Sequence, residues 1–99
     1  GILLLDEPTQ ALDLHQAATV MEVLARKAAE GLCVVAVLHD LNLAALFCDR
    51  LILLQDGKIA ADGAPAEILT EKHLFPAYGD KIEVLRRPET QNPIILAKK

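Results

Sequence analysis

Hydrophobic residues in the first half of the chain form short uninterrupted runs. Ile2–Leu5 and Leu32–Leu38 are such runs, rich in branched aliphatic side chains. Runs of this length without alternation are typical of strands covered on both faces, which usually belong to parallel sheets. Between them, apolar residues recur at helical spacing, at Ala17, Val20, Met21, Leu24 and Ala28. The pattern predicts a strand–helix–strand unit with parallel strands and a right-handed crossover.

Capping residues mark the ends of this predicted helix. Asp13 is a favourable N-cap, and Gln16 stands three residues later, as in a capping box. Gly31 follows the last apolar position and predicts the end of the helix. Before the helix, Pro8 favours an extended backbone at Glu7, which would keep that carboxylate at the end of the first strand.

The rest of the chain predicts shorter elements. A helix from about Asp40 to Cys48 is followed by a strand over Leu51–Leu54, a hairpin turn at Asp56-Gly57 and a strand near Lys58–Ala61. After a turn at Asp62-Gly63 come a helix from Pro65 to Leu69 and a weaker helix within 70–79. The chain ends with two strands around a Pro88–Pro93 loop. We expect strands 2–5, 32–38 and 51–54 to share one sheet. The predicted fold class is α/β, with a partly parallel sheet, flanking helices and a C-terminal β hairpin.

Composition and charge narrow the class of protein. The 99 residues are 53% hydrophobic and 3% aromatic, which favours an aliphatic core and argues against disorder. The net charge of −4 and the scattered basic residues argue against a nucleic-acid partner. Cys33 and Cys48 have no close partner and are predicted to be small core residues in a reducing compartment. The chain begins at Gly1, and its single methionine is Met21, which suggests a fragment, a processed product or an incompletely expressed chain.

Charged side chains follow both long apolar runs. Asp6 and Glu7 come directly after the first run, and His39 and Asp40 come after the second. Parallel strands end at the same edge of a sheet, where open α/β sheets bind ligands. A carboxylate there suits Mg²⁺, a second can orient or deprotonate water, and a histidine can donate to a phosphate oxygen. The set fits hydrolysis of a nucleoside triphosphate. Alternatively, the acids cap a turn and His39 has only a structural role.

Two segments carry a resemblance to a known family. "ILLLDEPTQALD" resembles the Walker B segment and D-loop of ATP-binding cassette (ABC) ATPases, which have a P-loop NTPase-like fold. "VVAVLHDLNLAALFCDRLILLQDGKIAADGAPAEIL" resembles their H-loop strand, following helix and C-terminal hairpin. The match covers most of residues 1–69. The two motifs occur in the family's order with a helix between them, so the resemblance is specific.

The resemblance implies a role for each site residue. Asp6 would help to hold Mg²⁺, Glu7 would polarise the attacking water, and His39 would contact the γ-phosphate of ATP. Asp13 would lie in the D-loop, touch the partner subunit and, with Asp6, belong to the cofactor-binding residues. Gln10 departs from the pattern, because the family commonly has serine there. The implied partners are a second ATPase subunit in a homodimer, transmembrane permease subunits and, indirectly, a periplasmic binding protein. The implied location is the cytoplasmic face of a bacterial inner membrane.

Two family motifs are absent from the chain. It has no Walker A loop of the form G-x-x-x-x-G-K-[ST], and no LSGGQ-like signature segment. The chain therefore resembles only the C-terminal part of the cassette, with residues 1–69 as the Walker B, D-loop and H-loop core and residues 70–99 as a C-terminal extension. Because nothing cradles the phosphates, we expect the 99 residues alone to be inactive.

The resemblance also extends to a subclass of transporters. "HDLNLAA" is similar to ATPases of importers for iron chelates, haem and cobalamin, and "AYGDKIEVLRRPETQNPIIL" is similar to haemin importer ATPases. We expect an ATP hydrolase that drives uptake of haemin or an iron chelate. The alternatives are the ATPase of a ferric-siderophore or cobalamin importer, a translation or DNA-repair ATPase, and a non-catalytic structural fragment.

Overall fold

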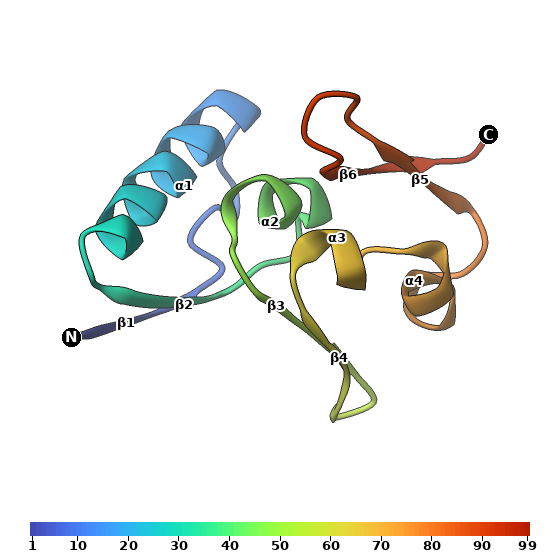
Figure 1. The fold of residues 1–99 in the computed structure, drawn as a ribbon, viewed down its shortest axis with the longest axis horizontal. Coiled ribbons are helices and arrows are strands. Elements are labelled where there is room, and N and C mark those ends of the chain that lie inside the picture. Colours follow the sequence, from blue (N-terminus) through green and yellow to red (C-terminus); the bar gives the residue numbers. More distant parts are fainter.

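The computed structural model describes residues 1–99 and contains four helices and six strands (Figure 1). In chain order they are β1 (Ile2–Asp6), α1 (Leu14–Ala29), β2 (Cys33–Val37), α2 (Leu41–Phe47), β3 (Leu51–Gln55), β4 (Lys58–Gly63), α3 (Pro65–Ile68), α4 (Glu71–Tyr78), β5 (Ile82–Arg86) and β6 (Pro93–Ala97). The two chain ends lie at opposite sides of the molecule. None of the helices combines the length and apolar character that a membrane-spanning helix needs.

Strands β1 and β2 are parallel, as the strand–helix–strand pattern predicts. Their register pairs Ile2 with Cys33 and Asp6 with Val37. The connecting helix begins at the predicted capping box, in which the Asp13 carboxylate accepts a hydrogen bond from the Gln16 N–H at 2.7 Å. The helix ends before Gly31, whose φ of +105° suits a residue without a side chain.

One face of this strand pair is uncovered in these 99 residues, although apolar runs without alternation are typical of strands covered on both faces. Helices α1 and α2 lie on one side of the strands in Figure 1, and side chains alternate along both strands between half-buried and exposed. The half-buried set is Leu3, Leu5, Val34 and Ala36; the exposed set is Ile2, Leu4, Cys33, Val35 and Val37. Cys33 is therefore not the core residue that the sequence predicts. The second face is apolar in sequence, but no element of the chain packs on it.

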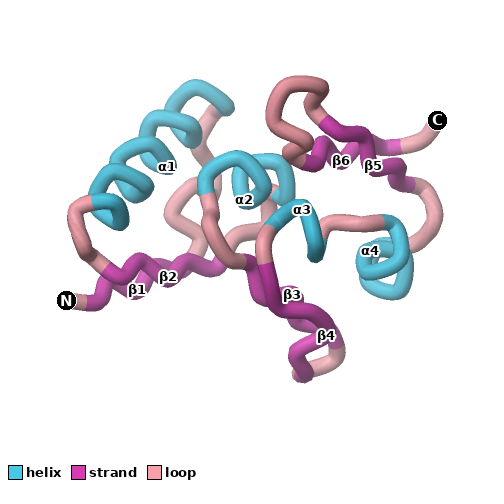
Figure 2. Tube along the Cα trace, in the orientation of Figure 1, coloured by secondary structure: helices cyan, strands magenta, loops and turns pink.

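The expectation of one sheet containing the first three strands is wrong. The six strands form three separate pairs, β1–β2, β3–β4 and β5–β6; strands are magenta in Figure 2. Strand β3 pairs only with β4, its immediate neighbour in sequence. The short loop between β3 and β4 closes at little entropic cost, which favours their pairing. No strand of this chain lies between β2 and β3 to join them in one sheet. Each strand consequently has one unpaired edge.

The β3–β4 hairpin turns at Asp56-Gly57, as predicted. Both residues have positive φ, 52° and 74°, the geometry of a type I′ turn. The further turn predicted at Asp62-Gly63 is wrong, because β4 continues to Gly63, opposite Leu51. Asp62 accepts two hydrogen bonds from Arg50, at 2.8 and 2.7 Å, which tie the open end of the hairpin. This bonding, and then the attraction of the Arg50 charge, lower the pKa of Asp62.

Helix α2 connects the two parts of the hydrophobic core. Its Leu43 packs with Ala17 and Met21 of α1. Its Ala45 packs with Leu69 and Leu74, in a cluster that also contains side chains of the C-terminal β5–β6 hairpin. That hairpin forms as predicted, although Pro93 begins β6 and does not end the loop. Helix α2 thus lies between α1 and the C-terminal hairpin.

Candidate functional site

The site begins where β1 and β2 end side by side. Asp6 is paired with Val37, and the Glu7 N–H donates to the Val37 carbonyl at 2.9 Å. The chain then continues to Glu7 from one strand and to His39 from the other. Because the strands are parallel and in register, these side chains leave the sheet at the same edge.

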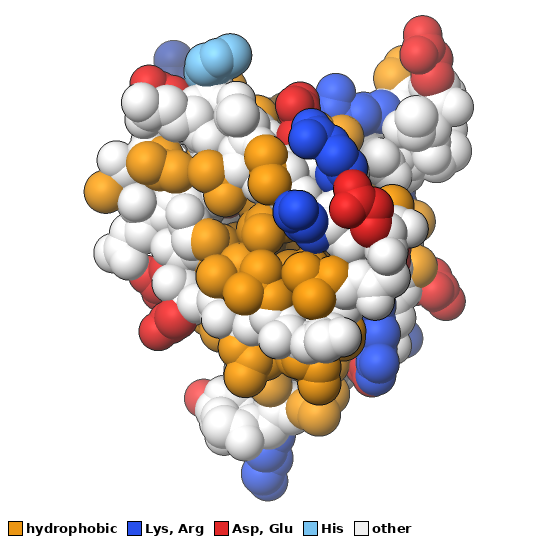
Figure 3. Space-filling model, turned by 90° about the vertical axis from the view of Figure 1, so that its left-hand side faces the viewer, with side chains coloured by type: hydrophobic (Ala, Val, Ile, Leu, Met, Phe, Trp, Pro, Cys, Tyr) orange, Lys and Arg blue, Asp and Glu red, His pale blue; other side chains and the backbone are white.

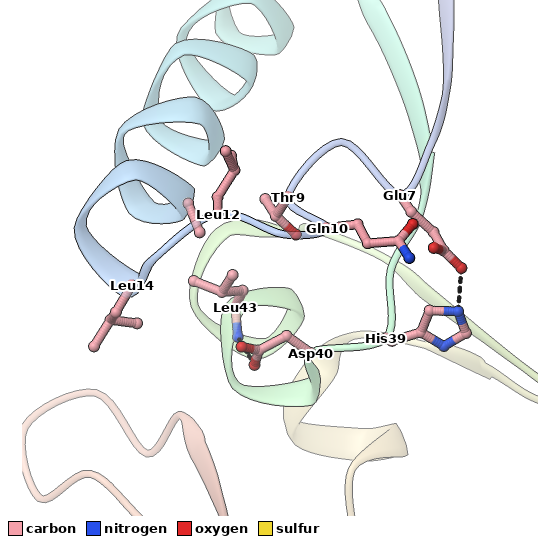
Figure 4. Close-up of a pocket in the computed structure, with 9 residues that line it drawn as sticks. Glu7, Thr9, Gln10, Leu12, Leu14, His39, Asp40 and Leu43 are labelled. Atoms are coloured by element: carbon pink, nitrogen blue, oxygen red, sulfur yellow. Dashed lines mark hydrogen bonds and ion pairs between the residues drawn. The ribbon is translucent and has the colours of Figure 1, made fainter.

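Glu7 and His39 contact each other directly. The Glu7 carboxylate and the His39 Nε2 form a hydrogen bond, and the two side chains point toward one another in Figure 4. The His39 side chain is 79% exposed, whereas that of Glu7 is 23% exposed. A carboxylate beside an imidazole at an accessible edge can bind, orient or deprotonate a small polar molecule.

The backbone at Glu7 differs from the prediction. Pro8 favours an extended conformation at the preceding residue, but Glu7 has a φ of +52°, in the left-handed region. Backbone bonds hold the residue there, since its N–H bonds Val37 and its carbonyl accepts from the Gln10 N–H at 3.1 Å. Left-handed backbone at residues other than glycine costs roughly 1–3 kcal/mol and clusters at functional sites. Here it turns the Glu7 side chain toward His39.

Asp6 lies on a different side of the strand from Leu5. It is exposed, on the face opposite α1, and does not line the hollow described below. The structure holds no cluster of three potential metal-ligating side chains. Mg²⁺ is commonly held by one or two carboxylates together with substrate phosphates. A single accessible carboxylate such as Asp6, next to Glu7, fits that kind of site.

Two other acidic residues act as helix caps. Asp13 caps α1 through its capping box. Asp40 caps α2, because its carboxylate accepts from the N–H groups of Asn42 and Leu43 at 2.9 and 3.0 Å. The Asp13 carboxylate thus forms its hydrogen bond within α1 in this structure. The Asp40 cap fixes the start of α2 one residue after His39.

An open hollow of about 310 Å³ lies beside the Glu7–His39 pair. Its lining is polar near Glu7 and apolar toward α1, and comprises Glu7, Thr9, Gln10, Leu12, Leu14, Ala17, His39, Asp40 and Leu43. The Gln10 side chain extends toward Glu7. No lysine or arginine lines the hollow, so no cation there would balance a triphosphate. Sequence reasoning gave no role to Thr9 or to the apolar wall, although Thr9 and Leu12 lie within the segment that resembles Walker B and the D-loop.

Comparisons with known proteins match the chain over nearly all its length. It is 48% identical over 96 residues to the hemin import ATP-binding protein HmuV of Aliivibrio fischeri, covering 97% of this chain and 37% of that protein. It is 45% identical over 97 residues to the HmuV of Rhodococcus jostii, covering 98% of this chain and 33% of that protein. The chain therefore spans about a third of the length of these curated relatives. No protein-family model matches it.

Solved structures give the same fold. One is cbiO1 from Clostridium perfringens, part of the ABC transporter complex cbiONQ, with a TM-score of 0.61 and 30% identity over 76% of this chain and 30% of that one. Another is an ABC transporter described as of the metal-chelate type, in an inward-facing conformation, with a TM-score of 0.76. It covers 99% of this chain and 40% of that one at 22% identity. In sequence and in fold, these 99 residues are similar to a C-terminal part of ATP-binding cassette transporter ATPases.

Proposed function

We propose that this segment supplies the hydrolytic edge of an importer ATPase that uses ATP to drive uptake of haemin or an iron chelate. The observation that carries the proposal is the contact between Glu7 and His39 at the ends of two parallel strands. The names of the similar curated proteins support haemin as the cargo. The alternative cargoes are a ferric siderophore and cobalamin.

Each residue of the site has a proposed part in hydrolysis. The Glu7 carboxylate, three-quarters buried and held by its backbone bonds, orients the attacking water and accepts its proton. The exposed His39 imidazole donates to the terminal phosphate as negative charge develops on it. Asp6 would hold Mg²⁺, which would supply positive charge to balance the phosphate oxygens. ATP and Mg²⁺ are thus the proposed cofactors.

The partners are proposed on the same basis. Leu12, in the turn before α1, and Leu14, the first residue of α1, are 38% and 75% exposed beside the hollow. Such a surface suits a second ATPase subunit, with Asp13 near the nucleotide shared by the two copies. Permease subunits in a bacterial inner membrane and, through them, a periplasmic binding protein would complete the importer. Residues 1–69 would form the catalytic part, and residues 70–99 the extension.

A complementation experiment tests the cargo. A full-length ATPase carrying these 99 residues is expressed in a bacterium that lacks its own haemin import ATPase but keeps the permease. We expect growth on haemin as the only iron source, and none with the Glu7→Gln variant. Growth that depends on the ATPase with a ferric siderophore or cobalamin, but not with haemin, would reassign the cargo.

Loss of the His39 imidazole should slow turnover. In the same full-length protein, we expect His39→Ala to lower kcat for ATP hydrolysis by about 10²–10³-fold, the usual cost of removing one donor to a developing negative charge. The matched control is His15→Ala, because His15 is exposed at the start of α1 and lines no part of the hollow. Equal rates for the two variants would contradict the role given to His39.

A further inference from the structure

Helix α2 joins the Glu7–His39 pair to the C-terminal hairpin. It begins at Leu41, after the cap at Asp40, so its first turn determines how the chain leaves His39. The His39 side chain is largely exposed, and its only hydrogen bond is to Glu7. The position of the imidazole therefore depends on the backbone on either side of it, β2 before and α2 after.

Asn42, in the first turn of α2, is bonded to the middle of β6. Its Nδ2 donates to the Ile95 carbonyl at 3.1 Å, and its Oδ1 accepts from the Ile95 N–H at 2.7 Å. A side-chain amide has the donor and acceptor of a peptide group, so Asn42 pairs with the strand edge as a neighbouring strand would. Leu41 packs in the same cluster as Ile95. These contacts join residues that are 53 positions apart in the sequence.

We propose that Asn42 is a positioning residue, through which the β5–β6 hairpin holds His39 in contact with Glu7. The inference rests on the proposed hydrolytic role of that pair. If α2 shifts when the Asn42–Ile95 bonds are lost, His39 moves with the start of the helix, because only Asp40 separates them. Displacements on the order of 1 Å at a reacting centre lower rates strongly, up to about 10²-fold. The C-terminal extension thereby acts on hydrolysis without touching the nucleotide.

The test measures kcat and KM for ATP in a full-length ATPase carrying the segment. We expect Asn42→Ala to lower kcat by roughly 2- to 30-fold, the range of coupling through contacts of this kind, and to leave KM unchanged. In the His39→Ala background the same substitution should have no further effect, because the residue acts through His39. The matched control is Gln55→Ala, which removes another side-chain bond to a backbone carbonyl, the 2.8 Å bond to Pro76.

A second variant separates positioning from folding. Asn42→Asp keeps the size of the side chain and puts an acid in the first turn of a helix, where it is favourable. It loses the Nδ2 donor and sets a carboxylate oxygen against the Ile95 carbonyl. We expect this variant to melt cooperatively, as followed by circular dichroism, and to show the lowered kcat of Asn42→Ala.

The outcomes distinguish this inference from the proposed function. Full-rate hydrolysis by Glu7→Gln would overturn the proposed function and this inference with it. An inactive Glu7→Gln together with wild-type kcat for both Asn42 variants would overturn the positioning role alone. The positioning role would also be overturned if Asn42→Ala lowered kcat equally in the wild-type and His39→Ala backgrounds. A loss of kcat with Gln55→Ala as large as that with Asn42→Ala would overturn it too.

Discussion

Replacing Glu7 by glutamine in a full-length ATPase carrying this segment is expected to lower ATP hydrolysis by about 10²–10⁴-fold. Glutamine has nearly the same shape and can still accept a hydrogen bond from His39, but it cannot accept the proton of the attacking water. ATP binding should change little, because the hollow beside Glu7 has no lysine or arginine to bind phosphates. Single-turnover hydrolysis and equilibrium binding of a fluorescent ATP analogue measure the two effects separately.

The matched control for this experiment is Glu22→Gln, which removes the same charge from an exposed position on α1. It should hydrolyse ATP at the wild-type rate. If Glu7→Gln also retains that rate, Glu7 is neither base nor water-orienting residue, and the proposed function fails. A large loss of ATP binding with Glu7→Gln would instead mean that Glu7 supports the nucleotide site as a whole.

The 99-residue chain by itself is expected to self-associate and to bind MgATP poorly. The uncovered face of β1 and β2 exposes Ile2 and Leu4 at 72% each, with Val35 and Val37 at about half. Figure 3 shows hydrophobic side chains gathered across one side of the molecule. Contiguous apolar surface and unpaired strand edges both favour association. Poor nucleotide binding follows because the hollow beside Glu7 has no cation and the chain has no phosphate-binding loop.

Light scattering after size-exclusion chromatography and calorimetric titration with MgATP measure these two properties. The double variant Leu4→Lys, Val35→Glu places opposite charges on adjacent positions of the uncovered face, and should reduce association. Its control, Leu54→Lys, removes a leucine of similar exposure, at 66%, that lies in β3 of the separate β3–β4 hairpin. A monomeric wild-type chain that binds MgATP tightly would overturn the expectation.

Features encoded by neighbouring residues could be predicted from the sequence. The capping box of Asp13 and Gln16, the end of α1 at Gly31 and the turn at Asp56-Gly57 each depend on a few adjacent positions, and each is present. Parallel pairing of β1 and β2 followed from the helix between two apolar runs. The convergence of Glu7 and His39 then required only that parallel strands end together.

Features set by distant contacts could not be predicted. The left-handed backbone at Glu7 opposes the local preference imposed by Pro8, and is held by bonds to Val37 and Gln10. The sheet to which β3 belongs depends on which strand pairs with it, and the residues of β3 itself do not identify that strand. The bonds between Asn42 and Ile95 join exposed polar groups far apart in sequence, for which hydrophobic periodicity gives no signal.

The uncovered face also carries a thiol. Cys33 is exposed beside Ile2, whereas Cys48 is partly buried, and burial together with the nearby Asp49 raises the pKa of the Cys48 thiol. Thiols react as thiolates, so a maleimide reagent should modify Cys33 well before Cys48. Peptide mapping by mass spectrometry after brief labelling would show this order, and equal labelling of both would contradict the burial described here. Anything that packs over β1 and β2 should slow the labelling of Cys33, which makes this cysteine an internal chemical reporter of whether that face is covered.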